Sequence, residues 1–151
     1  MRFKVFALCL LAFALSGLPA HAGEVLIKPD EAALPPAPGT ATSKLAFITR
    51  GLTRRPNVVL TSPVASVTSP FTLKLAFKAH GGSTIKPGSF EAIYLKKPNV
   101  DLTARVTPFV TANGVDMVGA EAPPGRHVIK VKITDSDGRE GSAVVVVNVL
   151  K

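Results

Sequence analysis

Hydrophobic and polar residues alternate most regularly near the C-terminus, with the two-residue period of a β-strand. In residues 125–134 His127, Ile129, Val131 and Ile133 share one parity, while Lys130 and Lys132 occupy the other, so one face is buried and the other meets water. A second β-branched run, residues 142–150, follows a turn rich in Asp and Gly. The pattern predicts a β-hairpin over residues 124–150. Its predicted buried positions are His127, Ile129, Val131, Ile133, Val145, Val147 and Val149.

Shorter runs precede this hairpin and are separated by turn residues at the spacing expected of a β-sandwich. The clearest is residues 71–78, in which large apolar side chains alternate with polar or small ones. Residues 90–96 carry apolar side chains on both parities, so we expect both faces of that strand to be partly covered. Residues 102–107 alternate again and stop at Pro108. The predicted strands before the hairpin are residues 57–62, 71–78, 90–96, 102–107 and 115–120, with a short extended piece at 109–111.

No part of this region carries a sustained helical period. Residues 57–151 therefore predict an all-β fold, a single seven-stranded antiparallel sandwich of the immunoglobulin-like type. The inner face of residues 71–78 is the expected partner of the C-terminal hairpin.

The first residues have the three regions of a secretory signal peptide. Arg2 and Lys4 are followed by an apolar stretch, residues 5–15, and by the small-x-small sequence Ala20-His21-Ala22. The apolar stretch is shorter than the roughly 20 residues of a transmembrane helix. We therefore expect residues 1–22 to be a cleaved signal peptide, and the mature protein to be periplasmic or secreted without a transmembrane segment.

Residues 23–56 differ in composition from the rest of the chain. Frequent proline, with Gly and Thr, predicts an extended tether that cannot hold a sheet ladder, although Leu26-Ile27 could add a short strand. The end of this segment is basic, and Arg50, Arg54 and Arg55 form the densest positive cluster of the mature chain. The expected divisions are a signal peptide (1–22), an extended proline-rich and basic segment (23–56) and a sandwich domain (57–151).

Charge and cysteine content narrow the class of protein. The whole chain has 18 basic and 10 acidic residues, and without Arg2 and Lys4 the mature chain has 16 and 10, a net charge of +6. This charge favours approach to anionic surfaces such as lipid headgroups, envelope polymers or acidic proteins. Alternatively, the lysines are solvent-facing residues that protect sheet edges. The single cysteine, Cys9, would leave with the signal peptide, so we expect no disulfide and no thiolate metal site.

The mature chain has two histidines, His80 and His127. His80 lies in a glycine-containing loop without an obvious partner. His127 lies on the buried parity of its strand, where it is either a catalytic or metal-binding group or a corner residue. We favour a corner residue whose ring hydrogen-bonds a nearby backbone, as the tyrosine corner does in related sandwiches.

The sequence Asp135-Ser136-Asp137-Gly138 has the carboxylate spacing of a calcium loop. An EF-hand, however, needs an oxygen ligand at the fifth position and Gly at the sixth, where Arg139 and Glu140 stand. The alternative is an Asx-type turn in which Asp135 accepts backbone N–H groups. We expect no metal and no cofactor.

Other motifs of catalysis are lacking. The sequence has no nucleophile elbow, phosphate-binding loop or zinc-protease motif. Four central carboxylates could in principle supply a pair for glycoside hydrolysis, but their spacing favours no particular pair. The mature chain also has no Trp and only one Tyr to stack against a sugar. Nucleic-acid binding is disfavoured because the basic residues lack interleaved aromatics. The four central carboxylates are Glu91, Asp101, Asp116 and Glu121.

Three stretches carry a resemblance to a known class of module. Residues 83–90 (STIKPGSF) look like the lead into a third strand, residues 99–103 (NVDLT) follow it, and residues 124–139 look like a penultimate strand with its closing turn. In these stretches the chain resembles the bacterial immunoglobulin-like and fibronectin type III-like modules of exported proteins. The resemblance covers about two-thirds of the chain and implies architecture, not activity.

Together these features favour a non-catalytic interaction or structural module of the cell envelope. Its expected partner is an unidentified envelope or extracellular protein or polymer. The alternative is an electrostatic binder of an anionic envelope component through Arg50, Arg54 and Arg55. A hydrolase built from carboxylates and a histidine is the remaining, less favoured, hypothesis.

Overall fold

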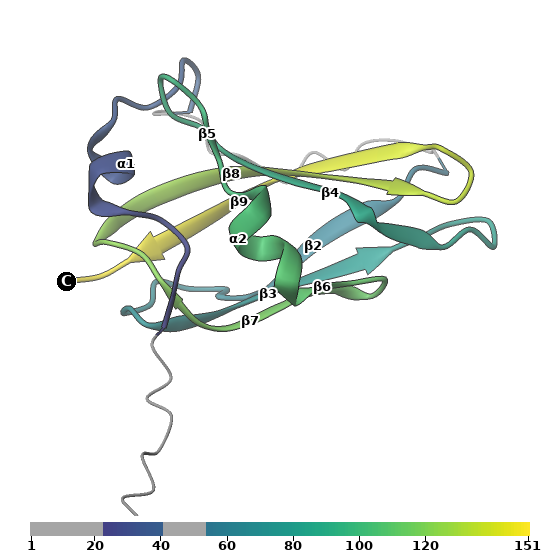
Figure 1. Cartoon of the computed structure of the whole chain (residues 1–151), viewed down its shortest axis with the longest axis horizontal. Coiled ribbons are helices and arrows are strands. Elements are labelled where there is room, and N and C mark those ends of the chain that lie inside the picture. The colour runs from purple at the N-terminus through teal and green to yellow at the C-terminus, as the bar shows by residue number, and fades with distance from the viewer. Residues whose placement is uncertain (1–22, 41–53) are drawn as a thin grey trace, which may run out of the picture.

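The structure is a computed structural model that describes residues 23–40 and 54–151. In these residues two β-sheets pack face to face, with short helices along one side (Figure 1). One sheet has the order β1 (Glu24–Val25), β7 (Gly114–Glu121), β3 (Phe71–Lys78), β2 (Asn57–Ser62), with β6 (Val110–Thr111) paired to β7. The other has the order β5 (Val100–Asp101), β4 (Ile85–Tyr94), β8 (Gly125–Asp135), β9 (Glu140–Val149). The predicted all-β class is confirmed, and residues 57–151 form eight strands instead of the predicted seven.

The C-terminal hairpin is present and has the predicted buried face. Strands β8 and β9 pair antiparallel without interruption from Gly125↔Val149 to Thr134↔Glu140. Each position that the two-residue period placed inside is buried, because the inner face of this sheet packs against the inner face of β3. The buried side chains of the hairpin inner face are His127, Ile129, Val131, Ile133, Val145, Val147 and Val149.

Strands β3 and β4 supply the core from either sheet. In β3 the alternate residues Phe71, Leu73, Leu75 and Phe77 are buried, as predicted. In β4 the inward positions are Phe90, Ala92 and Tyr94, while Ile93 and Leu95 on the outer side are half-buried. The expectation that both faces of this segment are partly covered is therefore correct.

The strand predicted at residues 102–107 is wrong. The chain there forms α2 (Thr103–Val106) and a 3-10 turn, η1 (Thr107–Phe109). Leu102 and Val106 are both buried, and a separation of four residues places two side chains on one face in a helix as well as in a strand. Ala104 separates the two alternatives, because it would be buried in a strand and is exposed here.

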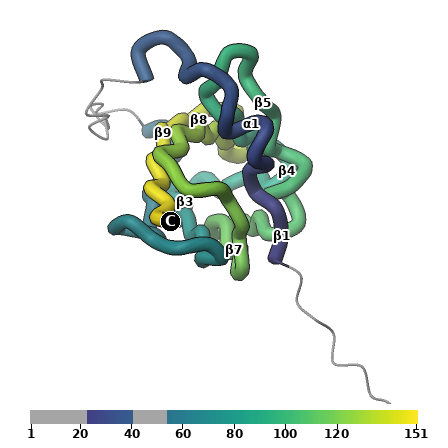
Figure 2. The backbone as a smooth tube through the Cα atoms, turned by 90° about the vertical axis from the view of Figure 1, so that its left-hand side faces the viewer, coloured from purple at the N-terminus to yellow at the C-terminus, as the bar shows by residue number. Residues whose placement is uncertain are grey.

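The prediction of an extended tether is also wrong for its described part. We call residues 23–40 the N-terminal strap. Its first residues form β1, which pairs in parallel with β7, and Leu26 and Ile27 are 1% and 2% exposed in the core. A one-turn helix, α1 (Pro29–Ala33), follows, and Figure 2 shows the strap running along the side of the sandwich from β7 to β4. Proline does not prevent this, because Pro29 occupies the first helical turn, where its missing N–H has no intrahelical acceptor to lose.

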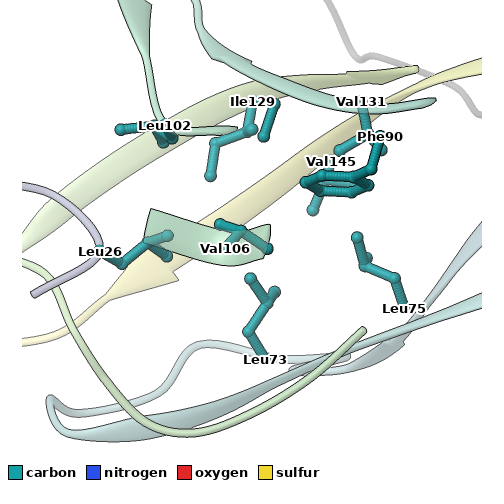
Figure 3. Close-up of a pocket in the computed structure, with 10 residues that line it drawn as sticks. Leu26, Leu73, Leu75, Phe90, Leu102, Val106, Ile129, Val131 and Val145 are labelled. Atoms are coloured by element: carbon teal, nitrogen blue, oxygen red, sulfur yellow. The ribbon is translucent and has the colours of Figure 1, made fainter. Parts of the chain in front are cut away.

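The strap, α2 and both sheets share one core. Figure 3 shows Leu26, Leu102 and Val106 directed into the space between the sheets, toward Leu73 and Ile129. The space left between these side chains is about 10 Å³ and is lined only by apolar residues. A dry gap of that size, at the limit for a single water molecule, is a feature of packing and not a ligand site.

The core packing predicts unequal effects of neighbouring substitutions in β3. Leu75→Ala should lower the free energy of unfolding by about 2–5 kcal/mol, because it removes buried volume from the centre of the core. Lys74→Ala should cost less than about 1 kcal/mol, because this lysine is exposed and its ion pair with Asp116 is solvated. Urea denaturation measures both, and equal losses would contradict the observed register.

Candidate functional site

A buried polar pair joins β4 to the beginning of β8. The Tyr94 hydroxyl lies 2.9 Å from Nδ1 of His127, and both side chains are almost fully buried. The other ring nitrogen, Nε2, lies 2.7 Å from the carbonyl oxygen of Pro123. A carbonyl can only accept, so Nε2 carries the proton and Nδ1 accepts the hydrogen bond from Tyr94. The corner role predicted for His127 is confirmed by this bond to the backbone four residues upstream.

Burial keeps both rings neutral. It raises the pKa of Tyr94 to about 12, and the negative charge of Glu31 acts in the same direction. Burial also lowers the pKa of His127, with a smaller contribution of the same sign from Lys96, although the Pro123 hydrogen bond opposes this. With each polar atom of the imidazole already occupied, this histidine is a structural group.

The turn between β8 and β9 is organised around a buried carboxylate. Oδ1 of Asp135 accepts the backbone N–H groups of Asp137 at 3.0 Å and of Arg139 at 2.9 Å, which confirms the predicted Asx-type turn. Oδ2 accepts Nε of Arg139 at 2.8 Å and the Ser83 hydroxyl at 3.1 Å. Burial acts to raise the pKa of Asp135, but the hydrogen bonds and charge of Arg139 outweigh it and leave this pKa lowered. The arginine neutralises the carboxylate, which is the role that a cation would have in the calcium-loop hypothesis.

The four carboxylates considered for catalysis do not converge. Glu91 and Asp116 form exposed ion pairs on different sheets, Glu91 with Lys132 of β8 and Asp116 with Lys74 of β3. Asp101 accepts the backbone N–H of Thr103 at 2.8 Å, at the start of α2. Glu121 lies at the end of β7, beside the first residue of the strap. The hydrogen-bond partners of His127 are Tyr94 and Pro123, not these carboxylates. The described residues contain no group of three His, Cys, Asp or Glu placed to hold a metal.

The basic cluster predicted as a binding site is described only in part. Arg50 lies outside the described residues. Arg54 and Arg55 are exposed, and they precede β2 at the end of the sandwich that carries the β8–β9 turn. Arg54 approaches Gly81, beside the guanidinium of Arg139. In the described residues neither Arg54 nor Arg55 takes part in an ion pair.

A second group of charged residues, which the sequence did not reveal, fastens the strap. Arg105 of α2 donates from two nitrogens to both carboxylate oxygens of Glu31 in α1, at 2.7 and 2.6 Å, and also to the Leu26 carbonyl at 3.0 Å. The hydrogen bonds from Arg105 lower the pKa of Glu31 despite its burial. The two residues are 74 positions apart, so no local pattern links them.

Two further cations hold backbone carbonyls of the strap. Nζ of Lys96 donates to the carbonyls of Ala32 and Leu34 at 2.7 and 2.8 Å, where α1 ends, and burial lowers the pKa of this lysine. Arg126 donates to the Thr40 carbonyl at 2.8 Å. A cavity of about 240 Å³ remains between strap and sheet, lined by Pro36, Thr40, Tyr94, Leu95, Lys96, Arg126 and Val128. It is smaller than typical small-molecule sites, and its lysine is engaged in holding the strap.

Comparison with protein-family models, with curated proteins and with solved structures found no match. Nor do the helices of the described residues include one with the length and apolar character needed to cross a membrane.

The buried histidine predicts a pH dependence of stability. Because its pKa is lowered in the folded protein, the unfolded state binds more protons below about pH 6.5, and stability should fall as the pH drops from there. Between pH 6.5 and 5 this loss can reach about 2 kcal/mol. Carboxylates with lowered pKa values lose their contribution only below about pH 4.5, outside this window.

His127→Gln is the matched variant, because its amide can still donate to Pro123. Urea denaturation at pH 7 and pH 5 should give a smaller difference for the variant than for the wild type. An unchanged difference would show that His127 titrates similarly in the folded and unfolded states.

Proposed function

We propose that this protein is an exported, non-catalytic β-sandwich module that acts by interaction or as a structural part of the cell envelope. The observation that carries the proposal is the separation of the titratable groups. His127 and Asp135 are buried and satisfied by structural hydrogen bonds, while the central carboxylates lie on different sheets and at different ends. A hydrolase would need at least two such groups to meet at one place.

The order of the strands supports an immunoglobulin-like assignment of the sandwich. Strands β2, β3 and β7 would correspond to A, B and E in one sheet, and β4, β8 and β9 to C, F and G in the other. The hydrogen bond of His127 to a backbone carbonyl just before β8 occupies the place of the tyrosine corner at the start of strand F. Strand D would be reduced to β6, which pairs antiparallel with β7, and the segment between β5 and β6 is helical. Such sandwiches serve unrelated functions, which leaves the partner open.

Export rests on the features of residues 1–22 and can be tested directly. Protein recovered from outside the cytoplasm should begin at Gly23 and should lack Cys9. Intact-mass measurement of the periplasmic and secreted fractions detects both. A mature species that still contains Cys9 would contradict signal-peptide cleavage and, with it, the proposed location.

The second candidate function is attraction to an anionic envelope component through Arg50, Arg54 and Arg55. The observation that favours it is the exposure of Arg54 and Arg55 at one end of the sandwich, without ion pairs to other described residues. Charges held in this way attract anionic surfaces at long range and add little to stability.

Replacement of all three arginines with Ser should abolish retention on anionic vesicles at low salt and leave the melting temperature nearly unchanged. Retention of the wild type should weaken as salt shortens the screening length from about 10 Å at 0.1 M to about 3 Å at 1 M. The matched control removes equal charge elsewhere by replacing three exposed lysines, Lys86, Lys97 and Lys151, with Ser. If both triple variants lose retention equally, net charge and not this cluster is responsible.

A further inference from the structure

Glu121, the last residue of β7, contacts residues 23–27 of the strap at both ends of that segment. Its backbone carbonyl accepts the N–H groups of Leu26 at 2.9 Å and Ile27 at 3.2 Å. Its side chain lies against Gly23, where an added Cβ would come within 2.7 Å of the Glu121 Cδ and 2.8 Å of its Cγ. Between these contacts, β1 pairs in parallel with β7. Glu121 therefore contacts this segment both at its first residue and where it enters the core.

The Glu121 side chain occupies the space beside the Gly23 Cα. Gly23 also stands directly after Ala22, where the small-x-small pattern places signal cleavage. In the uncleaved chain the nitrogen of Gly23 belongs to a neutral peptide bond. Cleavage converts this nitrogen into an α-ammonium group on the residue that packs against the Glu121 carboxylate.

We propose that cleavage after Ala22 creates an α-ammonium group at Gly23 that pairs with the Glu121 carboxylate and fastens the strap to β7. The inference rests on the export proposed above. Glu121 is available for this pairing, because the ion pairs among the described residues do not include it. The pair lies three residues before Leu26, so it holds the strap close to the point where the strap enters the core.

The consequence is a strap that is more firmly docked in the mature chain than in the precursor. A charged pair at the edge of a protein is worth little for global stability, but it acts on local opening, which is governed by few contacts. The side chains of Leu26 and Ile27 lie in the core, whereas residues 23–25 are joined to β7 through the pairing of β1. An added ion pair at Gly23 therefore acts on the more exposed end of this attachment.

A two-by-two experiment tests the pair. The chain beginning at Gly23 is prepared with a free or an acetylated α-amino group, and with Glu121 or Gln at position 121. Acetylation reproduces the neutral peptide nitrogen of the precursor, and Glu121→Gln removes the charge at constant size. Hydrogen exchange of the Leu26 and Ile27 amides reports opening of the strap, and exchange in β8 serves as the internal control.

Exchange at Leu26 and Ile27 should be about twofold to fivefold slower in the doubly charged form than in each of the other three. The three forms that lack one or both charges should be equal, because each has already lost the pair. Glu24→Gln, which removes a neighbouring exposed carboxylate of the strap, should leave the exchange unchanged. Independent, additive effects of the two changes, or no effect of either, would overturn the proposal.

The export hypothesis and the ion-pair hypothesis can be rejected independently of each other. If the native mature protein begins at another residue, the export boundary is wrong, while the two-by-two comparison still measures the pair in the chain that begins at Gly23. If the native protein begins at Gly23 and the four forms exchange alike, export stands and the ion pair is rejected.

Discussion

A sandwich of two sheets keeps its core dry only if the gap between the sheet edges is closed. In this protein one side is closed by the helix α2 and by the strap, not by a long strand. Helix α2 places Val106, with Leu102 just before it, between the sheets, and the strap adds Leu26 beside them. Arg105 ties the two elements together, since it binds both Glu31 and the Leu26 carbonyl. The guanidinium of Arg105 and the carboxylate of Glu31 are both largely shielded from solvent, and their charges neutralise each other. This side of the sandwich is therefore closed by a directional ion pair as well as by apolar packing.

The predictability of each element follows from the range of the interactions that determine it. The C-terminal hairpin and β3 have one wet and one dry face, so the two-residue period identified Leu75 and Val131 as core residues. At residues 102–107 the same rule failed, because Leu102 and Val106 satisfy both periods. The docking of the strap depends on contacts with β7 and α2 about 75 to 95 residues later, and no local pattern records them.

For polar residues, too, local interactions could be predicted from the sequence and long-range ones could not. The local bond of His127 to the backbone and the Asx turn of Asp135 could be predicted, because both partners lie within four residues. The partner of His127 in the other strand, Tyr94, could not. Arg105, on the polar parity of the strand expected at residues 102–107, binds both Glu31 and the Leu26 carbonyl of the strap. A charged residue that the sequence pattern places on the solvent face can thus have a structural role in the fold. A candidate catalytic or binding residue therefore has to be judged by the groups it already binds.

The strap also bears on the order in which this chain can fold during its synthesis. Its first residues leave the ribosome before any of their partners exist, and Leu26 is held by a side chain 79 positions later. Contacts of such large sequence separation form late, because the intervening chain must first be ordered. The strap therefore has nothing to dock against until α2 and β7 have been made. For the proposed exported protein, this delay favours a chain that is still unfolded while it crosses the membrane.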